Sequence, residues 1–130
     1  MTSHIFIGVT DFDRALPFYR ALMAALELDE RCHNPALPRT GWHSAGGERP
    51  YFVICTPENG LPHHADNGQM VGFAASSRAH VVRVYDAATA AGATDEGRPG
   101  LRPQYHDHYF GAYFRDPEGN KLCVACHDPA

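Results

Sequence analysis

Long apolar runs, a secretion signal and a stripe of basic residues are all missing from this sequence. No apolar stretch approaches the ~20 residues that a membrane-spanning helix requires, so we expect no contact with a membrane. Met1–Val9 has neither a basic start nor a small-residue cleavage site, which favours a cytoplasmic protein. The 11 Lys and Arg residues stand against 15 Asp and Glu residues, and the arginines are scattered. We therefore expect no nucleic-acid partner.

The four cysteines need not pair, because 130 residues can bury a sufficient core without disulfides. Two of the four cysteines stand in the stretch Cys123-Val124-Ala125-Cys126-His127, which has the C-x-x-C-H pattern of covalent haem attachment. This short apolar stretch follows the turn sequence Asp116–Asn120, which predicts a strand. Residues three apart on a strand point to opposite faces, so one haem would not reach both sulfurs. We expect two separate core cysteines and no haem.

Histidine and tyrosine are the residues that the chain has in unusual number. Nine histidines and six tyrosines occur among the 130 residues. Imidazole is the commonest metal ligand and a frequent acid or base in polar pockets, so these residues direct the search for a site.

The first half of the chain has the pattern of a strand followed by a helix and three more strands. An apolar run over His4–Val9 predicts the first strand, and a helix follows with Leu16, Tyr19, Met23 and Leu26 on its apolar face. Asp11 or Asp13 can cap this helix, and Pro17 predicts that its regular part begins late. Short segments near 29–33 and 40–44 and the run 51–55 predict the three strands.

The same order of elements recurs in the second half. Residues 70–74 predict a strand and Ser76 or Ser77 caps a helix that ends before Gly92. Its buried face is predicted to consist of Val81, Val84, Tyr85, Ala88 and Ala91. A short segment at 93–96, a Gly and Pro loop at 97–103 and a hairpin of 109–115 with 121–126 complete the pattern.

This repetition predicts an α+β fold made of two tandem βαβββ modules, residues 1–56 and 70–130, joined by a linker over 57–69. Each module would be a curved mixed sheet with its helix on the outside, and the two sheets would surround a cleft. Strand alternation predicts that His4, Phe6, Met70 and Gly72 face that cleft.

Two motifs in this pattern resemble those of a known family. They are His4-x-x-x-x-Val9-x-Asp11-x-x-x-Ala15-x-x-Phe18-Tyr19 in the first half and Phe114-x-Asp116-Pro117-x-Gly119-Asn120 before the last strand. With the repeat, they resemble the vicinal oxygen chelate superfamily, which contains glyoxalase I, bleomycin-resistance proteins, fosfomycin-resistance enzymes and extradiol dioxygenases. The resemblance covers nearly the whole chain and implies one domain over residues 1–130, on a fold that supports several chemistries.

The resemblance also implies where a metal would be held, since metal-binding members use one His or Glu on each of four strands. His4 matches the first position, and Cys123 occupies the fourth, where glutamate is usual. Met70 stands where histidine is usual, and Ile54, or a neighbour after a small register shift, where a carboxylate is usual. This implies a degenerate or rebuilt site, with His4 and Cys123 as the remaining ligands for a zinc, nickel, iron or manganese ion. The alternative is that His4 is a hydrogen-bonded core residue and that Cys123 is a small buried one.

Further chemistry is predicted in the segment Tyr105-His106-Asp107-His108-Tyr109. His106 and His108 share a face if this segment is extended, so either can complete a metal site or move a proton. Tyr105 would then act with them in catalysis by stabilising an oxyanion, as would Tyr109 or Tyr113. The alternative is that both histidines are exposed loop residues.

Two functions remain open at this point. The first is a glyoxalase-like lyase, isomerase or transferase that acts on a small molecule. The second is a metal-free protein of the bleomycin-resistance type that binds or sequesters a small molecule. In both, the candidates for substrate contact are Trp42, Phe52, Met70, Tyr109 and Tyr113. The resemblance also implies a homodimer.

Overall fold

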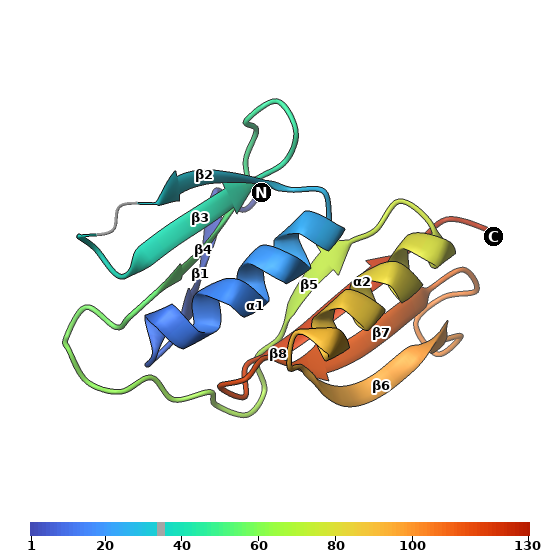
Figure 1. Ribbon diagram of the computed structural model, residues 1–130. Helices are drawn as coiled ribbons and strands as arrows, with labels where there is room; N and C mark the ends of the chain where they lie inside the picture. Colours follow the sequence, from blue (N-terminus) through green and yellow to red (C-terminus); the bar gives the residue numbers. More distant parts are fainter. Residues whose placement is uncertain (34–35) are drawn as a thin grey trace. The chain divides into compact units, whose positions relative to one another are not determined.

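The computed structural model describes residues 1–33 and 36–130, which divide into two compact units, Met1–Ala65 and Asp66–Ala130. We call these units module one and module two. Each contains a strand, a helix and three further strands in that order, and its strands form one mixed sheet of four (Figure 1). The predicted α+β fold of two tandem βαβββ modules is thus confirmed. No helix in the described part of the chain has both the length and the apolar character needed to cross a membrane.

Module one contains five elements, with the strand order β1-β4-β3-β2 in its sheet. β1 and β4 are parallel, and the other neighbouring pairs are antiparallel. The elements are β1 (His4–Gly8), α1 (Phe12–Ala25), β2 (Asp29–His33), β3 (Arg39–His43) and β4 (Tyr51–Cys55).

Helix α1 begins earlier than its proline predicts. Asp11 is the N-cap, and its side chain accepts a hydrogen bond of 3.1 Å from the Arg14 N–H, so the helix starts at Phe12. The late start that Pro17 predicts for the regular helix is therefore wrong. A proline inside the helix removes one backbone hydrogen bond, but the buried side chains on both sides of it, including Ala15 and Phe18, anchor the helix on the sheet.

The core of module one lies between α1 and its sheet. Phe52 packs against Tyr19 of the helix with ring centroids 5.7 Å apart, and against Trp42 with centroids 6.3 Å apart. Trp42 is 2% exposed and Phe52 is 5% exposed. The expectation that these two rings contact a substrate is therefore corrected, because their positions on β3 and β4 point them toward α1.

Module two repeats this arrangement, with the strand order β5-β8-β7-β6. β5 is parallel to β8, and the remaining neighbours are antiparallel. The elements are β5 (Val71–Ala74), α2 (Arg78–Ala90), β6 (Thr94–Leu101), β7 (Phe110–Arg115) and β8 (Lys121–Cys126).

The sequence predicts the cap of α2 correctly but misplaces the end of β6. The Ser77 hydroxyl accepts a hydrogen bond of 3.0 Å from the His80 N–H at the start of α2. The expected loop at 97–103 is largely strand, because β6 continues to Leu101 with irregular register around Gly97 and Gly100. Glycine in a strand often marks a bulge, so these residues distort the ladder without ending it.

A tight turn built on Asp116 joins β7 to β8. One carboxylate oxygen accepts hydrogen bonds from the backbone N–H groups of Glu118 and Asn120, at 2.9 and 2.8 Å. The other oxygen accepts from the Asn120 side chain at 2.8 Å, and Asp116 is only 3% exposed. Gly119 has φ of 92°, which glycine adopts without strain. The Asp-Pro-x-Gly-Asn motif is thus a structural turn.

The C-x-x-C-H motif lies on β8, as predicted, with Cys123 and Cys126 both 2% exposed. Alternation places Cys126 on the same face as Val124, which packs toward α2, and Cys123 on the opposite face. The two cysteines therefore lie on opposite faces of a strand, which is the geometry that led us to expect no haem site.

Candidate functional site

The main cluster of polar and aromatic side chains in module two lies on the face of its sheet opposite α2. We call this the helix-free face of module two, and it carries Tyr113 and Cys123, which are cross-strand partners on β7 and β8. The Tyr113 hydroxyl donates a hydrogen bond of 3.0 Å to the Tyr109 hydroxyl, which lies 3.5 Å from the Cys123 Sγ. The three groups form one connected set, here called the phenol–thiol cluster.

Burial controls the ionisation of the phenol–thiol cluster. It raises the pKa of Tyr109 strongly, and the hydrogen bonds with Cys123 and Tyr113 raise it further. Burial also raises the pKa of Tyr113 and of the Cys123 thiol above their ordinary values. All three groups therefore stay protonated at neutral pH, so the cluster offers O–H and S–H donors and holds no thiolate nucleophile.

Arginine and glycine complete this face. The Arg102 guanidinium carbon lies 5.4 Å from the centroid of the Tyr113 ring, and its Nη2 donates a hydrogen bond of 2.7 Å to the Arg98 carbonyl. A Cβ at Gly97 would lie 3.3 Å from that Nη2, and a Cβ at Gly111 would lie 2.8 Å from the Tyr109 ring. The glycines thus let the guanidinium and the phenol lie against the sheet.

The histidine segment that precedes β7 is a turn, so the expectation that His106 and His108 share a face of an extended segment is wrong. The His108 N–H donates to the His106 Nδ1 at 3.1 Å, which turns the chain back on itself. The His106 Nε2 lies 2.9 Å from the Nδ1 of His127, and their rings stack with centroids 5.2 Å apart. Tyr109 presents its ring to both, at 5.7 and 5.1 Å.

Module two therefore brings together most of the site residues predicted for it. Tyr105 packs on Tyr109 with ring centroids 5.0 Å apart, next to His106 and the phenol–thiol cluster. His108 is exposed, as is Met70, whose exposed fraction is 48%. Sequence reasoning missed His127 and Arg102. The signal for His127 was its position directly after β8. Because β7 and β8 are antiparallel, the end of β8 lies beside the start of β7.

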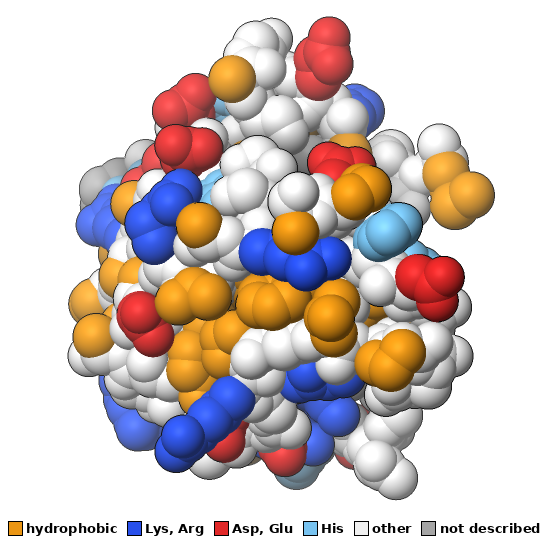
Figure 2. All heavy atoms as spheres, turned by 90° about the vertical axis from the view of Figure 1, so that its right-hand side faces the viewer, with side chains coloured by type: hydrophobic (Ala, Val, Ile, Leu, Met, Phe, Trp, Pro, Cys, Tyr) orange, Lys and Arg blue, Asp and Glu red, His pale blue; other side chains and the backbone are white. Residues whose placement is uncertain are grey.

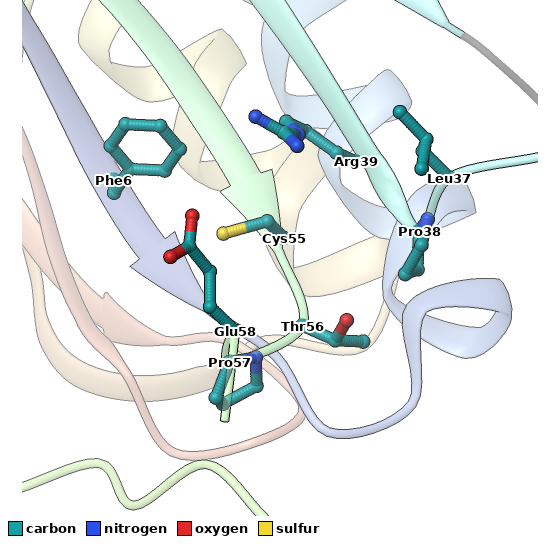
Figure 3. Close-up of a pocket in the computed structure, with 8 residues that line it drawn as sticks. All are labelled: Phe6, Leu37, Pro38, Arg39, Cys55, Thr56, Pro57 and Glu58. Carbon is teal, nitrogen blue, oxygen red and sulfur yellow. The ribbon is translucent and has the colours of Figure 1, made fainter. Parts of the chain in front are cut away.

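Module one has two neighbouring hollows on the face of its sheet opposite α1, which we call the helix-free face of module one. Figure 3 shows the first, the Cys55 hollow, in which the side chains of Arg39, Cys55 and Glu58 point toward the space beside Phe6. Its volume is about 190 Å³, and it is lined by Phe6, Leu37, Pro38, Arg39, Cys55, Thr56, Pro57 and Glu58. Burial raises the pKa of the Cys55 thiol, which is therefore neutral at pH 7.

The second hollow, here called the Tyr51 hollow, has a volume of about 200 Å³ and is lined by Phe6, Arg31, Arg39, Thr40, Gly41, Tyr51 and Val53. The Arg31 Nη1 donates a hydrogen bond of 2.6 Å to the Tyr51 hydroxyl, and its guanidinium carbon lies 4.4 Å from the ring centroid. Arg49 lies over the same ring at 4.3 Å. Arginine and aromatic groups thus dominate this hollow.

Comparison with known proteins settles the family. Residues 2–124 match the family model of the Glyoxalase/Bleomycin resistance protein/Dioxygenase superfamily. The chain belongs to this superfamily. A solved glyoxalase/bleomycin resistance protein from Albidiferax ferrireducens T118 is 35% identical, with a TM-score of 0.83, and the match covers 98% of this chain and 99% of that one. No curated protein matches the chain in sequence.

More distant members of the glyoxalase superfamily share the fold. The lactoylglutathione lyase from Agrobacterium tumefaciens is 21% identical with a TM-score of 0.65, over 97% of this chain and 92% of that one. TioX from Micromonospora sp. ML1 is 19% identical with a TM-score of 0.67, over 98% and 99% of the two chains. At these identities the likeness shows the fold alone.

The metal positions that the glyoxalase superfamily implies carry a poor set of donors in each module. In module one, His4 accompanies the neutral Cys55 thiol, and Ile54 is fully buried. The His4 Nδ1 lies 2.7 Å from the Ser3 hydroxyl. In module two, the protonated Cys123 and the thioether Met70 fill the remaining positions. Within neither module do three or more His, Cys, Asp or Glu side chains of the described residues gather as a metal site. These residues do not fit a resident hard divalent ion.

The surface charge agrees with the scattered arginines of the sequence. Figure 2 shows Lys and Arg side chains dispersed among hydrophobic and acidic ones on the face that it presents.

Proposed function

We propose that this chain is a metal-independent small-molecule-binding protein of the glyoxalase superfamily, of the kind represented by bleomycin-resistance proteins. The observation that carries the proposal is the phenol–thiol cluster, with Arg102 lying against it on the helix-free face of module two. The ligand is a small molecule with an oxygen acceptor that the cluster and the guanidinium bind together.

The chemistry of the cluster supports binding because its donors keep their protons. Tyr109 and Tyr113 have raised pKa values, so their hydroxyls remain hydrogen-bond donors across the physiological pH range. When the Cys123 S–H points to the Tyr109 oxygen, that oxygen accepts from both neighbours, and the Tyr109 proton is left for a ligand. The rings supply apolar area beside these donors.

The lack of a fitting donor set in either module supports a role without a metal. A catalytic zinc site needs about three protein ligands and one open position. The described residues of module one offer His4 with neutral or apolar partners, and those of module two offer a protonated Cys123. A binding role needs no metal, because the aromatic and cationic side chains can contact a ligand directly.

The test is a screen of small carbonyl and carboxylate compounds by ligand-observed NMR, run both with and without EDTA. We expect hits to bind the unmodified chain, and Tyr109→Phe to weaken them about tenfold, the cost of one hydrogen bond in a shielded site. Tyr85→Phe is the matched control, because Tyr85 lies on α2 and its hydroxyl donates to Asp95. Hits that EDTA abolishes, or that Tyr109→Phe leaves unchanged, would contradict the proposal.

A second candidate function is an acid–base enzyme of the lyase, isomerase or transferase type. It is favoured by the contact of His106 and His127 with Tyr109, which places a group able to move a proton beside a phenol able to stabilise an oxyanion. Each compound that binds should therefore be incubated with the protein and followed by mass spectrometry. Turnover that is lost in His106→Ala and kept in His64→Ala would establish this function. If the compounds are recovered unchanged, the binding function is the one supported.

A further inference from the structure

We infer that the Tyr51 hollow of module one binds a small aromatic carboxylate. This site lies in the other module from the phenol–thiol cluster, so the inference goes beyond the proposed function and can be tested separately. It rests on the charge, the hydrogen-bond donors and the size of the hollow.

The first argument is the unbalanced positive charge. Arg31 and Arg39 both line the hollow, and its lining contains no Asp or Glu. Among the described residues, none makes a hydrogen bond or ion pair with the Arg39 side chain, whereas the Arg20 side chain of the same module is paired with Glu30 at 2.9 Å. A guanidinium beside a hollow with no acidic group favours an anion as its partner.

The second argument is the orientation of Arg31. Its Nη1 donates to the Tyr51 hydroxyl at 2.6 Å, and its guanidinium lies over the Tyr51 ring. These contacts hold the planar group in one place while its other N–H groups remain available within the described part of the chain. A guanidinium that is already oriented loses less entropy when it binds a planar carboxylate through two N–H groups.

The third argument is the apolar surface and the space that accompany these charges. The Phe6 side chain is 51% exposed on β1, and Val53 and Gly41 lie beside it on β4 and β3. A Cβ at Gly41 would lie 3.1 Å from the Val53 side chain, so a larger residue at this position would crowd Val53 and fill part of the hollow. The volume of about 200 Å³ is adequate for one aromatic ring, since a protein cavity of ~150 Å³ admits benzene.

The neighbouring Cys55 hollow helps to place the anion. It shares Phe6 and Arg39 with the Tyr51 hollow but contains the Glu58 carboxylate, which repels an anion. The carboxylate of the ligand therefore lies on the side of Arg39 that faces Arg31, and the ring lies against Phe6. A cationic ligand would meet two guanidinium groups and be excluded.

The experiment titrates the full chain with benzoate, benzamide and benzylammonium, which share one ring size and differ in charge. Two-dimensional amide NMR follows the titration, with Gly41 and Val53 as the reporting residues. We expect benzoate to bind with Kd of about 1 mM, as its few atoms allow, and benzamide at least about tenfold more weakly. Arg39→Gln and Arg31→Gln should each weaken benzoate about fivefold or more, and higher salt should weaken it in the unmodified chain.

Arg14→Gln is the matched control, because Arg14 is an exposed arginine on α1 of the same module. Equal binding of benzamide, binding that Arg39→Gln leaves unchanged, or no response of Gly41 and Val53 to benzoate would each overturn the inference. Tyr109→Phe separates the two proposals. If the screened ligands respond to Tyr109→Phe while benzoate gives no response, the proposed function stands and the inference fails.

Discussion

The Nε2 atom of His106 lies 2.9 Å from the Nδ1 atom of His127, although 20 residues separate the two in the chain. The antiparallel pairing of β7 and β8 brings them together, since Phe110 pairs with Cys126 at this end of the ladder and the rings of Tyr109 and His127 lie beside it with centroids 5.1 Å apart. One ring must donate and the other accept, so at least one of the two is neutral when the bond is present.

Replacing His127 with Ala should therefore change the state of His106. We expect a loss of stability of at most about 1 kcal/mol, because both rings are exposed, together with a changed tautomer population of His106. Ring-nitrogen NMR measures the tautomer, and a double-mutant cycle with His106→Ala measures the coupling. His64→Ala, an exposed histidine of module one, should leave both unchanged. Identical His106 spectra in the His127 variant would show that the two rings do not interact in solution.

The phenol–thiol cluster should make the protein less stable as the solution becomes alkaline. Tyr109, Tyr113 and Cys123 have raised pKa values in the folded state, so they keep their protons where the unfolded chain has lost them. Their contribution to stability is complete below the ordinary pKa values of ~8.5 for a thiol and ~10 for a phenol, and is lost as the pH rises through the folded values.

Urea unfolding measured from pH 7 to pH 11 on the unmodified chain and on Tyr109→Phe tests this linkage. The unmodified chain should lose stability above about pH 10 more steeply than the variant, which lacks one ionisable group of the cluster. Tyr51→Phe is the control, since Tyr51 is a tyrosine of module one. Parallel pH profiles for the unmodified chain and Tyr109→Phe would contradict the linkage.

Acid should weaken a different contact, in module one. The Arg20 guanidinium holds the pKa of Glu30 below its ordinary value, with a smaller contribution from the buried Thr40 hydroxyl, which donates to Glu30 at 2.6 Å. A lowered pKa means that the contribution to stability is present above the ordinary value of ~4.3 and is lost as the pH falls through the folded value. Glu30→Gln should therefore cost about 0.5–1 kcal/mol at pH 7.

That difference between Glu30→Gln and the unmodified chain should shrink below about pH 4, because the carboxylate is then protonated. Thermal unfolding at a series of pH values measures it, with Glu48→Gln as the control at an exposed loop position. If the cost of Glu30→Gln were the same at pH 3 and pH 7, the ion pair would not be its cause.

Periodicity, caps and turn residues were sufficient to predict the order of elements, because each is a local signal. Asp11 and Ser77 lie at the caps that the sequence predicts, and the Asp116 motif forms the expected turn. The errors arose where a local signal was outweighed by packing. Pro17 lies inside α1 because the buried face of the helix holds it there, and Gly97 lies inside β6 because its neighbours on β7 complete the ladder.

The site was harder to predict because the residue type does not reveal which face of a strand it occupies. The run Tyr51–Cys55 is apolar throughout, so it has no period that separates the face toward α1 from the other one. The aromatic area of Phe52 predicts a contact with substrate, but Phe52 is a core residue, while Tyr51 beside it lines a hollow. His127 was missed because its neighbour His106 is distant in sequence and only the strand register joins them.

The turn at Asp116 gives a prediction on stability. Its buried carboxylate accepts two backbone hydrogen bonds and one from Asn120, so Asp116→Ala should cost about 2 kcal/mol or more by leaving these donors unpaired. Asp116→Asn keeps one acceptor oxygen and should cost less. Chemical unfolding measures both, and equal losses for the two variants would show that the hydrogen bonds are not what the turn requires.

Phe52 and Phe6 provide a matched pair, since they lie on adjacent strands of module one and point to opposite faces. Phe52 is 5% exposed and packs on Tyr19, so Phe52→Ala should cost about 3–5 kcal/mol through lost burial and a cavity. Phe6 is 51% exposed, so Phe6→Ala should cost less than about 1 kcal/mol while weakening benzoate in the Tyr51 hollow. Urea unfolding and the benzoate titration together separate the two roles. Full benzoate affinity in Phe6→Ala would remove Phe6 from the proposed site, and a large loss of stability in that variant would show that Phe6 has a structural role.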